Sequence, residues 1–250
     1  LCACGPEVTD LPQPTQAGAS ATTAPSNTKS PAATDEPAPT AKPAVADVPY
    51  RIAVLSDMTT RNVWDSFGPG ASTWNSVVQN AYYPTLYGQS VKRFDLVAFL
   101  AADWAATPVQ EGDFWVSTVP IRPGVYWSDG TEVTAEDAAW TANMALQFQL
   151  GGNWGYVDAG LDHAEALDKY TVKYYYAAQP GLAQHEYGTL LGPIVSKPYW
   201  EPKLADALGL LAGLSGLDPA GDEYQAKLAE AQGMLSALPS DGEPLLGPYN

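Results

Sequence analysis

The stretch VYWSDGTEVTAEDAAWTANMAL, residues 125–146, decides how the sequence is interpreted, because it combines a turn, a helix start and several acidic side chains. These acids are Asp129, Glu132, Glu136 and Asp137. They could form a catalytic or metal-binding cluster, or they could serve the local backbone. The requirements of a turn and of a helix start distinguish the two readings.

Each acid has a local structural role available to it. The sequence SDG, residues 128–130, is typical of a turn after a strand, since Ser and Asp bond nearby N–H groups and Gly permits an unusual backbone. Thr134 stands three residues before Asp137, the spacing of a helix capping box. Glu136 lies in the first helical turn, where the helix dipole favours negative charge. We therefore predict a helix over residues 135–150 that is started by these acids, with no catalysis required of them.

The pattern of apolar residues predicts short strands and helices from residue 50 onward. A strand over residues 113–121 would place Val116 and Thr118 on one face and Trp115 and Ser117 on the other. Further elements are predicted as a strand over residues 50–57, a helix over residues 73–83, and helical structure over residues 201–244.

The first residues differ in character from the rest of the chain. LCACG, residues 1–5, holds both cysteines of the sequence and is similar to a bacterial lipobox, which implies that residues 1–4 are the remnant of a signal peptide and that Cys4 is lipidated. Residues 5–49 are rich in Pro, Ala and Thr and poor in aliphatic and aromatic residues. Such a segment buries too little apolar surface to offset its chain entropy, so we predict a disordered tether.

Charge and composition exclude several classes of partner. The formal net charge is −16, from 12 Lys and Arg against 28 Asp and Glu. Nucleic acid is excluded as a partner because its phosphates require a basic face. No apolar run in the sequence approaches the ~20 residues that span a bilayer. The expected protein acts outside the cytoplasm and is held to the membrane by its lipid alone.

Several motifs together resemble the family 5 extracellular solute-binding proteins, the peptide- and nickel-binding components of ABC importers. The signature residues of the first motif are Trp127, Asp129, Gly130, Thr134 and Asp137. The similar segments are WSDGTEVTAED (127–137), NAYYPTLYG (80–88), ALDKYTVKYYYAAQP (166–180), GPIVSKPYW (192–200) and GPY (247–249).

The resemblance implies an α/β fold, the two-lobed clamshell of type II periplasmic binding proteins. It implies no enzyme activity and no cofactor. The implied role is to capture a small solute, most simply a peptide, and deliver it to an ABC transporter permease, with the full-length protein a monomer. Members of this family are longer, so residues 50–250 are expected to be the N-terminal part of the solute-binding domain, with the second half missing.

The predicted ligand contacts are Asn153, Trp154 and Tyr156, which lie among four glycines after the end of a helix. Pockets are typically lined by aromatic side chains and a few polar groups. The alternative, that Trp154 plugs the core beneath a loop, is equally supported. Other aromatic residues have spacings more typical of core positions: Tyr82, Tyr83 and Tyr87.

Two other classes of function stay open. An anchored extracellular hydrolase could pair Asp129 with Asp158 or Asp162, since glycosidases need two carboxyl groups roughly 5–10 Å apart. The other class is a lipoprotein that has no transport role and only binds to partner molecules. The sole histidines, His163 and His185, are interpreted as structural or surface residues, and no metal site is predicted, although the nickel-binding branch of the family leaves nickel as an outside possibility.

Overall fold

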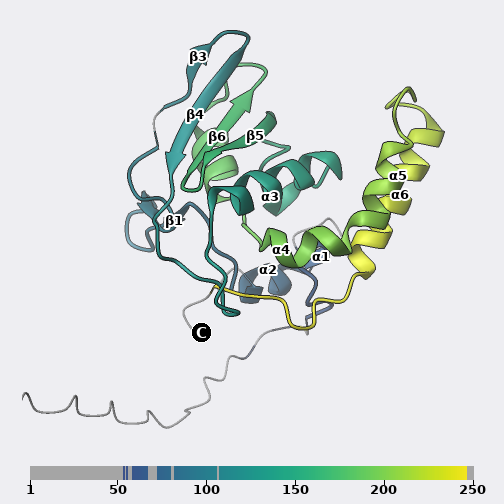
Figure 1. Cartoon of the computed structure of the whole chain (residues 1–250), viewed down its shortest axis with the longest axis horizontal. Helices are drawn as coiled ribbons and strands as arrows, with labels where there is room; N and C mark the ends of the chain where they lie inside the picture. Colours follow the sequence, from purple (N-terminus) through teal and green to yellow (C-terminus); the bar gives the residue numbers. More distant parts are fainter. Residues whose placement is uncertain are drawn as a thin grey trace, which may run out of the picture. The chain divides into compact units, whose positions relative to one another are not determined.

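A four-stranded antiparallel sheet with the strand order β3-β4-β6-β5 is the main sheet of the computed structural model (Figure 1). The structure describes residues 53, 55, 58–66, 72–79, 82–105 and 107–246, without the side chains of residues 66, 76, 78, 79 and 153. The strands are β3 (Val109–Glu111), β4 (Phe114–Pro120), β5 (Leu161–Asp168) and β6 (Thr171–Tyr176). Cys4, the segments 1–4 and 5–49, and the GPY motif at 247–249 lie outside the described residues. The predicted strand over 50–57 is described only at Ala53 and Leu55, and neither is in a strand.

The alternation predicted for β4 is confirmed by its register. Ser117 pairs with Tyr174 and Val116 pairs with Tyr175, so the two faces of β4 continue onto the two faces of β6. Tyr174 is fully buried, which identifies its face as the core face.

The segment 166–180, one of those similar to the family, contains the end of β5, a turn and all of β6. Asp168 pairs with Thr171 across a two-residue loop. The Asp168 carboxylate accepts a hydrogen bond of 2.8 Å from the Tyr170 N–H. This local side-chain bond favours a turn over a continuous strand.

The turn at residues 128–131 forms as predicted. Asp129 Oδ1 accepts hydrogen bonds from the N–H of Thr131 at 2.9 Å and from its hydroxyl at 2.6 Å. Gly130 has φ +86°, a conformation that a residue with a side chain rarely adopts. Trp127, which begins the motif, is buried. The acidic residue at 129 therefore stabilises a turn.

Glu132 joins this turn to the β5–β6 loop. Its carboxylate accepts hydrogen bonds from the Tyr170 hydroxyl at 2.7 Å and from Lys169 Nζ at 2.6 Å. These bonds lower the pKa of Glu132 to about 2, Lys169 contributing most. The role of Glu132 is thus also structural.

The helix start is the predicted capping box. Helix α3 (Ala135–Gln147) has Thr134 as its N-cap and Asp137 in the third helical position. Asp137 Oδ2 accepts the Thr134 N–H at 2.9 Å, and Oδ1 accepts the Lys197 N–H at 2.8 Å. The buried Asp137 carboxylate therefore ties α3 to the segment that begins α4 as well as capping its own helix.

Helix α3 covers the core face of the sheet (Figure 1). The Asn143 side-chain amide donates to the Ala164 carbonyl at 2.8 Å and accepts from the Ala164 N–H at 2.9 Å, which fixes the helix to β5. The helix ends at Gln147, earlier than predicted. Gln149 has φ +49°, and this left-handed conformation breaks the helical path before the glycines are reached.

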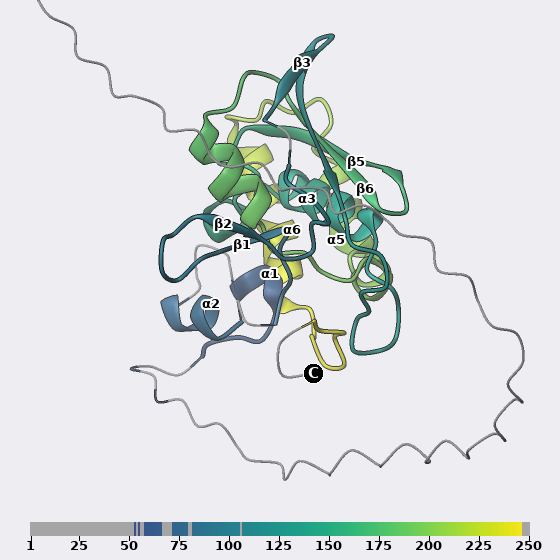
Figure 2. The same ribbon diagram turned by 90° about the vertical axis from the view of Figure 1, so that its left-hand side faces the viewer.

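The remaining elements lie on either side of this core. A small hairpin of β1 and β2 lies above α2 in Figure 2. In α2, Val77 is exposed. The predicted helical structure after residue 200 is confirmed by α5 and α6. The bounds of all the remaining elements are α1 (Val63–Ser66), α2 (Thr73–Gln79), β1 (Tyr87–Gln89), β2 (Leu96–Ala98), η1 (Gly152–Trp154), η2 (Gln184–Gly188), η3 (Thr189–Leu191), α4 (Lys197–Trp200), η4 (Glu201–Lys203), α5 (Ala205–Ala212) and α6 (Asp222–Ala237).

Within the described residues, no helix combines the length and the apolar character needed to cross a bilayer.

A cluster of four tryptophans joins α1, α3, η1 and α4. Trp64 stacks on Trp154, with ring centroids 4.9 Å apart and an interplanar angle of 15°. The rings of Trp140 and Trp200 meet Trp64 edge-on, at 6.0 Å and 5.8 Å. Such pairs contribute about 0.5–1.5 kcal/mol each beyond the burial of their area. The tryptophan cluster therefore connects parts of the chain that are distant in sequence.

The double role of Asp137 gives a graded prediction for stability. Thr134→Ala should lower the free energy of unfolding by about 1 kcal/mol, the cost of a helix cap. Asp137→Ala should lower it by about 2–3 kcal/mol, because it leaves buried N–H groups on two elements without acceptors. Urea denaturation of the purified variants measures both values. Glu136→Ala, which removes only a partly exposed pair with Lys197, is the control and should stay within about 0.5 kcal/mol of the parent. Equal losses for Thr134→Ala and Asp137→Ala would contradict the assigned link to α4.

Candidate ligand-binding site

A cavity of about 450 Å³ opens where three distant parts of the chain meet. This volume lies within the ~300–1,000 Å³ typical of small-molecule sites. Its lining residues come from three segments: the one before α1, the one after α2 and the one after α6. They are Met58, Arg61, Tyr82, Tyr83, Ser240, Asp241, Gly242, Glu243 and Leu245. We call it the α1–α6 cavity. In Figure 1 the segment after α6, in yellow, passes below α1 and α2.

Backbone hydrogen bonds hold the segment after α6 in place. The Leu246 N–H donates to the Tyr82 carbonyl at 3.1 Å. The Ser128 N–H donates to the Leu245 carbonyl at 3.0 Å, and the Leu245 N–H donates to Ser128 Oγ at 3.0 Å. One wall of the cavity is thus attached to the SDG turn and to the chain leaving α2.

The buried Asn62 fixes the other wall. Its Nδ2 donates to the carbonyls of Leu235, Ser236 and Leu238, at 2.8–3.1 Å, which caps the end of α6. Its Oδ1 accepts the Trp64 N–H at 3.0 Å, at the start of α1. One side chain therefore holds two helix ends together and sets the position of its neighbour Arg61.

Glu243 is the most distinctive residue of the α1–α6 cavity. Its Oε2 accepts a hydrogen bond of 2.7 Å from the Tyr83 hydroxyl, and its Oε1 accepts one of 2.7 Å from Trp200 Nε1. Burial raises the pKa of Glu243 to about 7, although both hydrogen bonds oppose the rise. Burial also raises the pKa of Tyr83. The carboxyl group is therefore held in a fixed orientation and changes its charge near neutral pH.

The other lining residues supply complementary groups. Arg61 and Asp241 are exposed and bring a positive and a negative charge to the cavity. Tyr82 is half-buried against the core, so the expectation that it is a core residue is only partly correct. Tyr83 and Tyr87 are buried, as predicted. The cavity thus offers a cation, two carboxyl groups and an aromatic ring to a small polar solute.

The residues predicted to contact a ligand lie elsewhere. Trp154 and Tyr156 are fully buried, Trp154 in the tryptophan cluster and Tyr156 with its hydroxyl donating to the Pro193 carbonyl at 3.1 Å. This burial agrees with the alternative that Trp154 plugs the core. The backbone of Asn153 is in η1, and its side chain lies outside the described residues. Ligand contact by these three residues stays a prediction.

The carboxyl pairs considered for a hydrolase are each engaged locally. Asp129 holds its turn, and Asp158 Oδ2 accepts the Gly152 N–H at 2.8 Å. Asp162 Oδ2 lies 2.7 Å from His163 Nδ1. Asp158 lines a shallow cavity beside Gly152 and Gly188 to which neither Asp129 nor Asp162 contributes.

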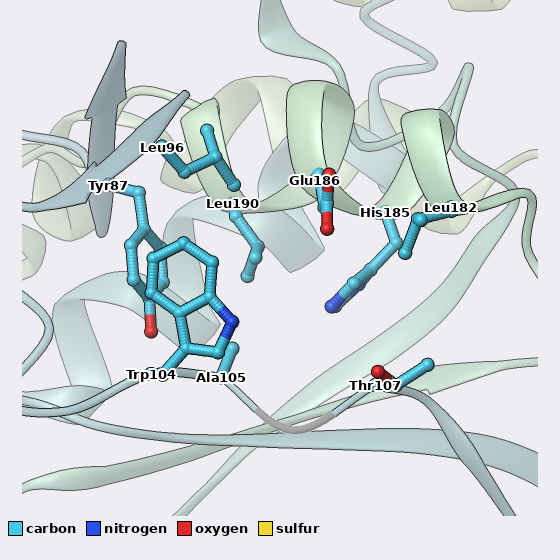
Figure 3. Close-up of a pocket in the computed structure, with 9 residues that line it drawn as sticks. All are labelled: Tyr87, Leu96, Trp104, Ala105, Thr107, Leu182, His185, Glu186 and Leu190. Carbon is cyan, nitrogen blue, oxygen red and sulfur yellow. The ribbon is translucent and has the colours of Figure 1, made fainter. Parts of the chain in front are cut away.

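His185 borders a second, much smaller cavity, shown in Figure 3. Trp104 meets Tyr87 edge-on on one side of it, with the ring centroids 5.4 Å apart, and Glu186 lies across from them. Its volume of about 20 Å³ suits a single water molecule. Burial lowers the pKa of His185 to about 4, so its ring is neutral, and its Nδ1 lies 2.9 Å from the Tyr176 hydroxyl. His185 is therefore structural, as interpreted.

His163, the second histidine, packs against an aromatic side chain of the sheet. His163 is partly exposed on β5 and stacks on Tyr175, with ring centroids 4.2 Å apart. In the part of the chain that the structure describes, no three His, Cys, Asp or Glu side chains gather into a group that could hold a metal ion.

The comparison with protein families decides the identity of the fold. The model described as "Bacterial extracellular solute-binding proteins, family 5 Middle" matches residues 95–224, just over half of the chain. The chain belongs to this family. The family 5 resemblance and the α/β fold class of the type II binding proteins, both predicted from the sequence, are confirmed. Family 5 proteins bind solutes and are not enzymes, in agreement with the structural roles of the acids at 129–137.

Several solved structures are similar to this family 5 chain. The oligopeptide-binding protein AppA from Bacillus subtilis, in complex with a nonapeptide, has a TM-score of 0.42 and 18% identity over 54% of this chain and 26% of its own. A periplasmic oligopeptide-binding protein from Thermotoga maritima has a TM-score of 0.44 and 25% identity over 57% of this chain and 25% of its own. NikZ from Campylobacter jejuni, in complex with Ni(L-His), has a TM-score of 0.39 and 21% identity over 49% of this chain and 23% of its own. The chain spans about a quarter of the length of each, and no curated protein matches it.

The raised pKa of Glu243 predicts an unusual pH dependence of stability. The folded protein favours the protonated carboxyl, so between about pH 4.5 and pH 7 it binds a proton that the unfolded chain releases. The free energy of unfolding should therefore fall as the pH rises through this window, by at most about 3 kcal/mol, and should level off above it. Urea denaturation of the parent and of Glu243→Gln across pH 4.5–8.5 measures the difference that belongs to this residue. Parallel curves for the two proteins would show that Glu243 titrates normally.

Proposed function

We propose that this family 5 chain is an extracytoplasmic solute-binding lipoprotein that captures a small solute, most simply a peptide, and delivers it to an ABC transporter permease. The observation that carries the proposal is the α1–α6 cavity. It presents Arg61, Glu243 and the half-buried Tyr82 together, in a family whose members bind solutes. A guanidinium, a carboxyl and an aromatic ring match the carboxylate, amine and apolar groups of a short peptide.

The domain organisation of this proposal follows the sequence. Cys4 carries the lipid, residues 5–49 form the tether, and residues 50–250 belong to the solute-binding domain, which acts as a monomer when full length. The lipid supplies the membrane attachment, and the tether allows the binding domain to reach the permease. Asn153, Trp154 and Tyr156 stay the ligand contacts predicted from the sequence, and Trp154 in addition supports the α1–α6 cavity through its stack on Trp64.

The first test is mutation of the cavity. Arg61→Ala and Tyr82→Ala should each weaken peptide binding by about tenfold, ~1.4 kcal/mol, because each removes a side chain that lines the cavity. Titration calorimetry with a panel of dipeptides to pentapeptides measures the affinities. Arg93→Ala, which removes an arginine with 81% exposure in a different part of the chain, is the matched control and should leave the affinity unchanged. The absence of saturable binding across the panel, or unchanged affinity in both cavity variants, would contradict the proposed site.

The second test concerns the anchor. When the full-length gene is expressed in a bacterial host, mass spectrometry of the mature protein should find acyl chains on Cys4, since stable attachment requires more than one chain. Cys4→Ser should leave the protein unacylated and in the soluble fraction. Cys2→Ser is the matched control and should retain the lipid. An unmodified Cys4 in the mature parent protein would refute the lipoprotein assignment.

A further inference from the structure

The carboxyl group of Glu243 lies in the wall of the α1–α6 cavity and forms no ion pair with any residue that the structure describes. Both of its oxygens accept hydrogen bonds, from the Tyr83 hydroxyl and from the Trp200 indole, and both donors are neutral. Burying a carboxylate that forms no ion pair costs free energy, and a positive charge that approaches the carboxylate reduces this cost.

The charged and titratable groups around Glu243 do not supply that charge. The positive charge of Lys203 lowers the pKa of Glu243, but its effect is weaker than those of burial and of the two hydrogen bonds. Lys203 Nζ instead lies over the Tyr199 ring, 3.8 Å from the centroid, and donates to the Pro239 carbonyl at 3.3 Å. Arg61 lines the same cavity without forming an ion pair with Glu243, and Asp241 adds a second negative charge at the rim.

We propose that the α1–α6 cavity takes a cationic solute, one that carries a protonated amine or a guanidinium, and that this group docks against Glu243. The proposal rests on the proposed function and names the class of solute. The bond from Trp200 Nε1 and the bond from the Tyr83 hydroxyl hold the carboxylate in place at the wall of the cavity and stabilise its charged form. A positive group of the solute then supplies the charged partner that the neutral donors Tyr83 and Trp200 do not provide to Glu243.

Docking of a cation has a consequence for protons. Near neutral pH about half of the Glu243 carboxyls carry a proton in the empty protein, because burial raises the pKa of this group to about 7. The approach of a positive charge favours the carboxylate, so the proton leaves Glu243 for the solvent while the solute keeps its own. Binding therefore releases about half a proton per solute at pH 7. Affinity should rise about tenfold from pH 6 to pH 8, as the ionised fraction of Glu243 grows.

Three peptides separate the possible sources of the cation: Ala-Lys-Ala, Ala-norleucine-Ala and N-acetyl-Ala-norleucine-Ala. Titration calorimetry on the full chain, at pH 6, 7 and 8 and in buffers of different ionisation enthalpy, gives both the affinity and the number of protons released. If a side-chain amine docks, Ala-Lys-Ala should bind about tenfold more tightly than Ala-norleucine-Ala at pH 8. If the amino terminus docks, acetylation should cost about tenfold instead. Either preference, together with proton release at pH 7, supports the proposal.

Two variants test whether Glu243 is the group responsible. Glu243→Gln should abolish the preference and the proton release, because an amide carries no titratable proton and no negative charge. Glu230→Gln removes an exposed carboxylate of α6 that does not line the cavity, and it should keep both effects. The measurements on the parent protein need no variant, so a poorly folded Glu243→Gln protein does not prevent the test.

The outcomes distinguish this inference from the proposed function. Equal affinities for all three peptides, with no proton release, would overturn the cationic solute and assign Glu243 a purely structural role between Tyr83 and Trp200, while peptide capture would stand. No binding of any of the three peptides would overturn both.

Discussion

The packing of Trp64 against three other tryptophans is the interaction on which the rest of the structure depends. Its ring meets Trp154 face to face, and Trp140 and Trp200 edge-on, so one residue of a short helix joins three later segments of the chain. A helix of four residues has no stability of its own, and its position must come from such contacts. The cluster also positions the α1–α6 cavity. Asn62 lies two residues before Trp64, and the Trp200 indole that packs on Trp64 donates its N–H to Glu243.

The structure contains two mostly buried carboxyl groups whose surroundings give them different roles. Asp137 accepts backbone N–H groups from Thr134 and Lys197, which are part of the architecture and cannot be exchanged for a ligand. Glu243 accepts side-chain donors at the wall of a cavity, where a further partner can approach. The backbone contacts of Asp137 join two elements, whereas the cavity around Glu243 leaves space for a solute. Burial of a charge therefore indicates a site only together with an accessible cavity.

Features with local causes could be predicted from the sequence. The SDG turn, the capping box at Thr134 and helix α3 each depend on residues within four positions of one another, and the family motif lies in the same stretch. The turn between β5 and β6 also has a local cause, the hydrogen bond accepted by the Asp168 side chain. The β-forming residues on both sides of it, however, favour a continuous strand in the sequence pattern. The glycines around Trp154 suggested a ligand loop, because a sequence pattern does not show that Trp64 lies ready to stack on this ring. Glu243 carried no signal, since its partner Tyr83 is 160 residues away.

That separation has a consequence for how the protein is made. A chain that emerges from its N-terminus presents Tyr83 long before Glu243 exists, and synthesis at roughly 5–20 residues per second puts about 8–32 s between them. During this interval the sheet and α3 have all their residues and can form, whereas one wall of the cavity has not been made. The Tyr83 hydroxyl and the Trp200 indole must stay solvated or find temporary partners. The cavity therefore closes later than the sheet and α3, and a nascent chain has no finished α1–α6 cavity until the segment after α6 has been added.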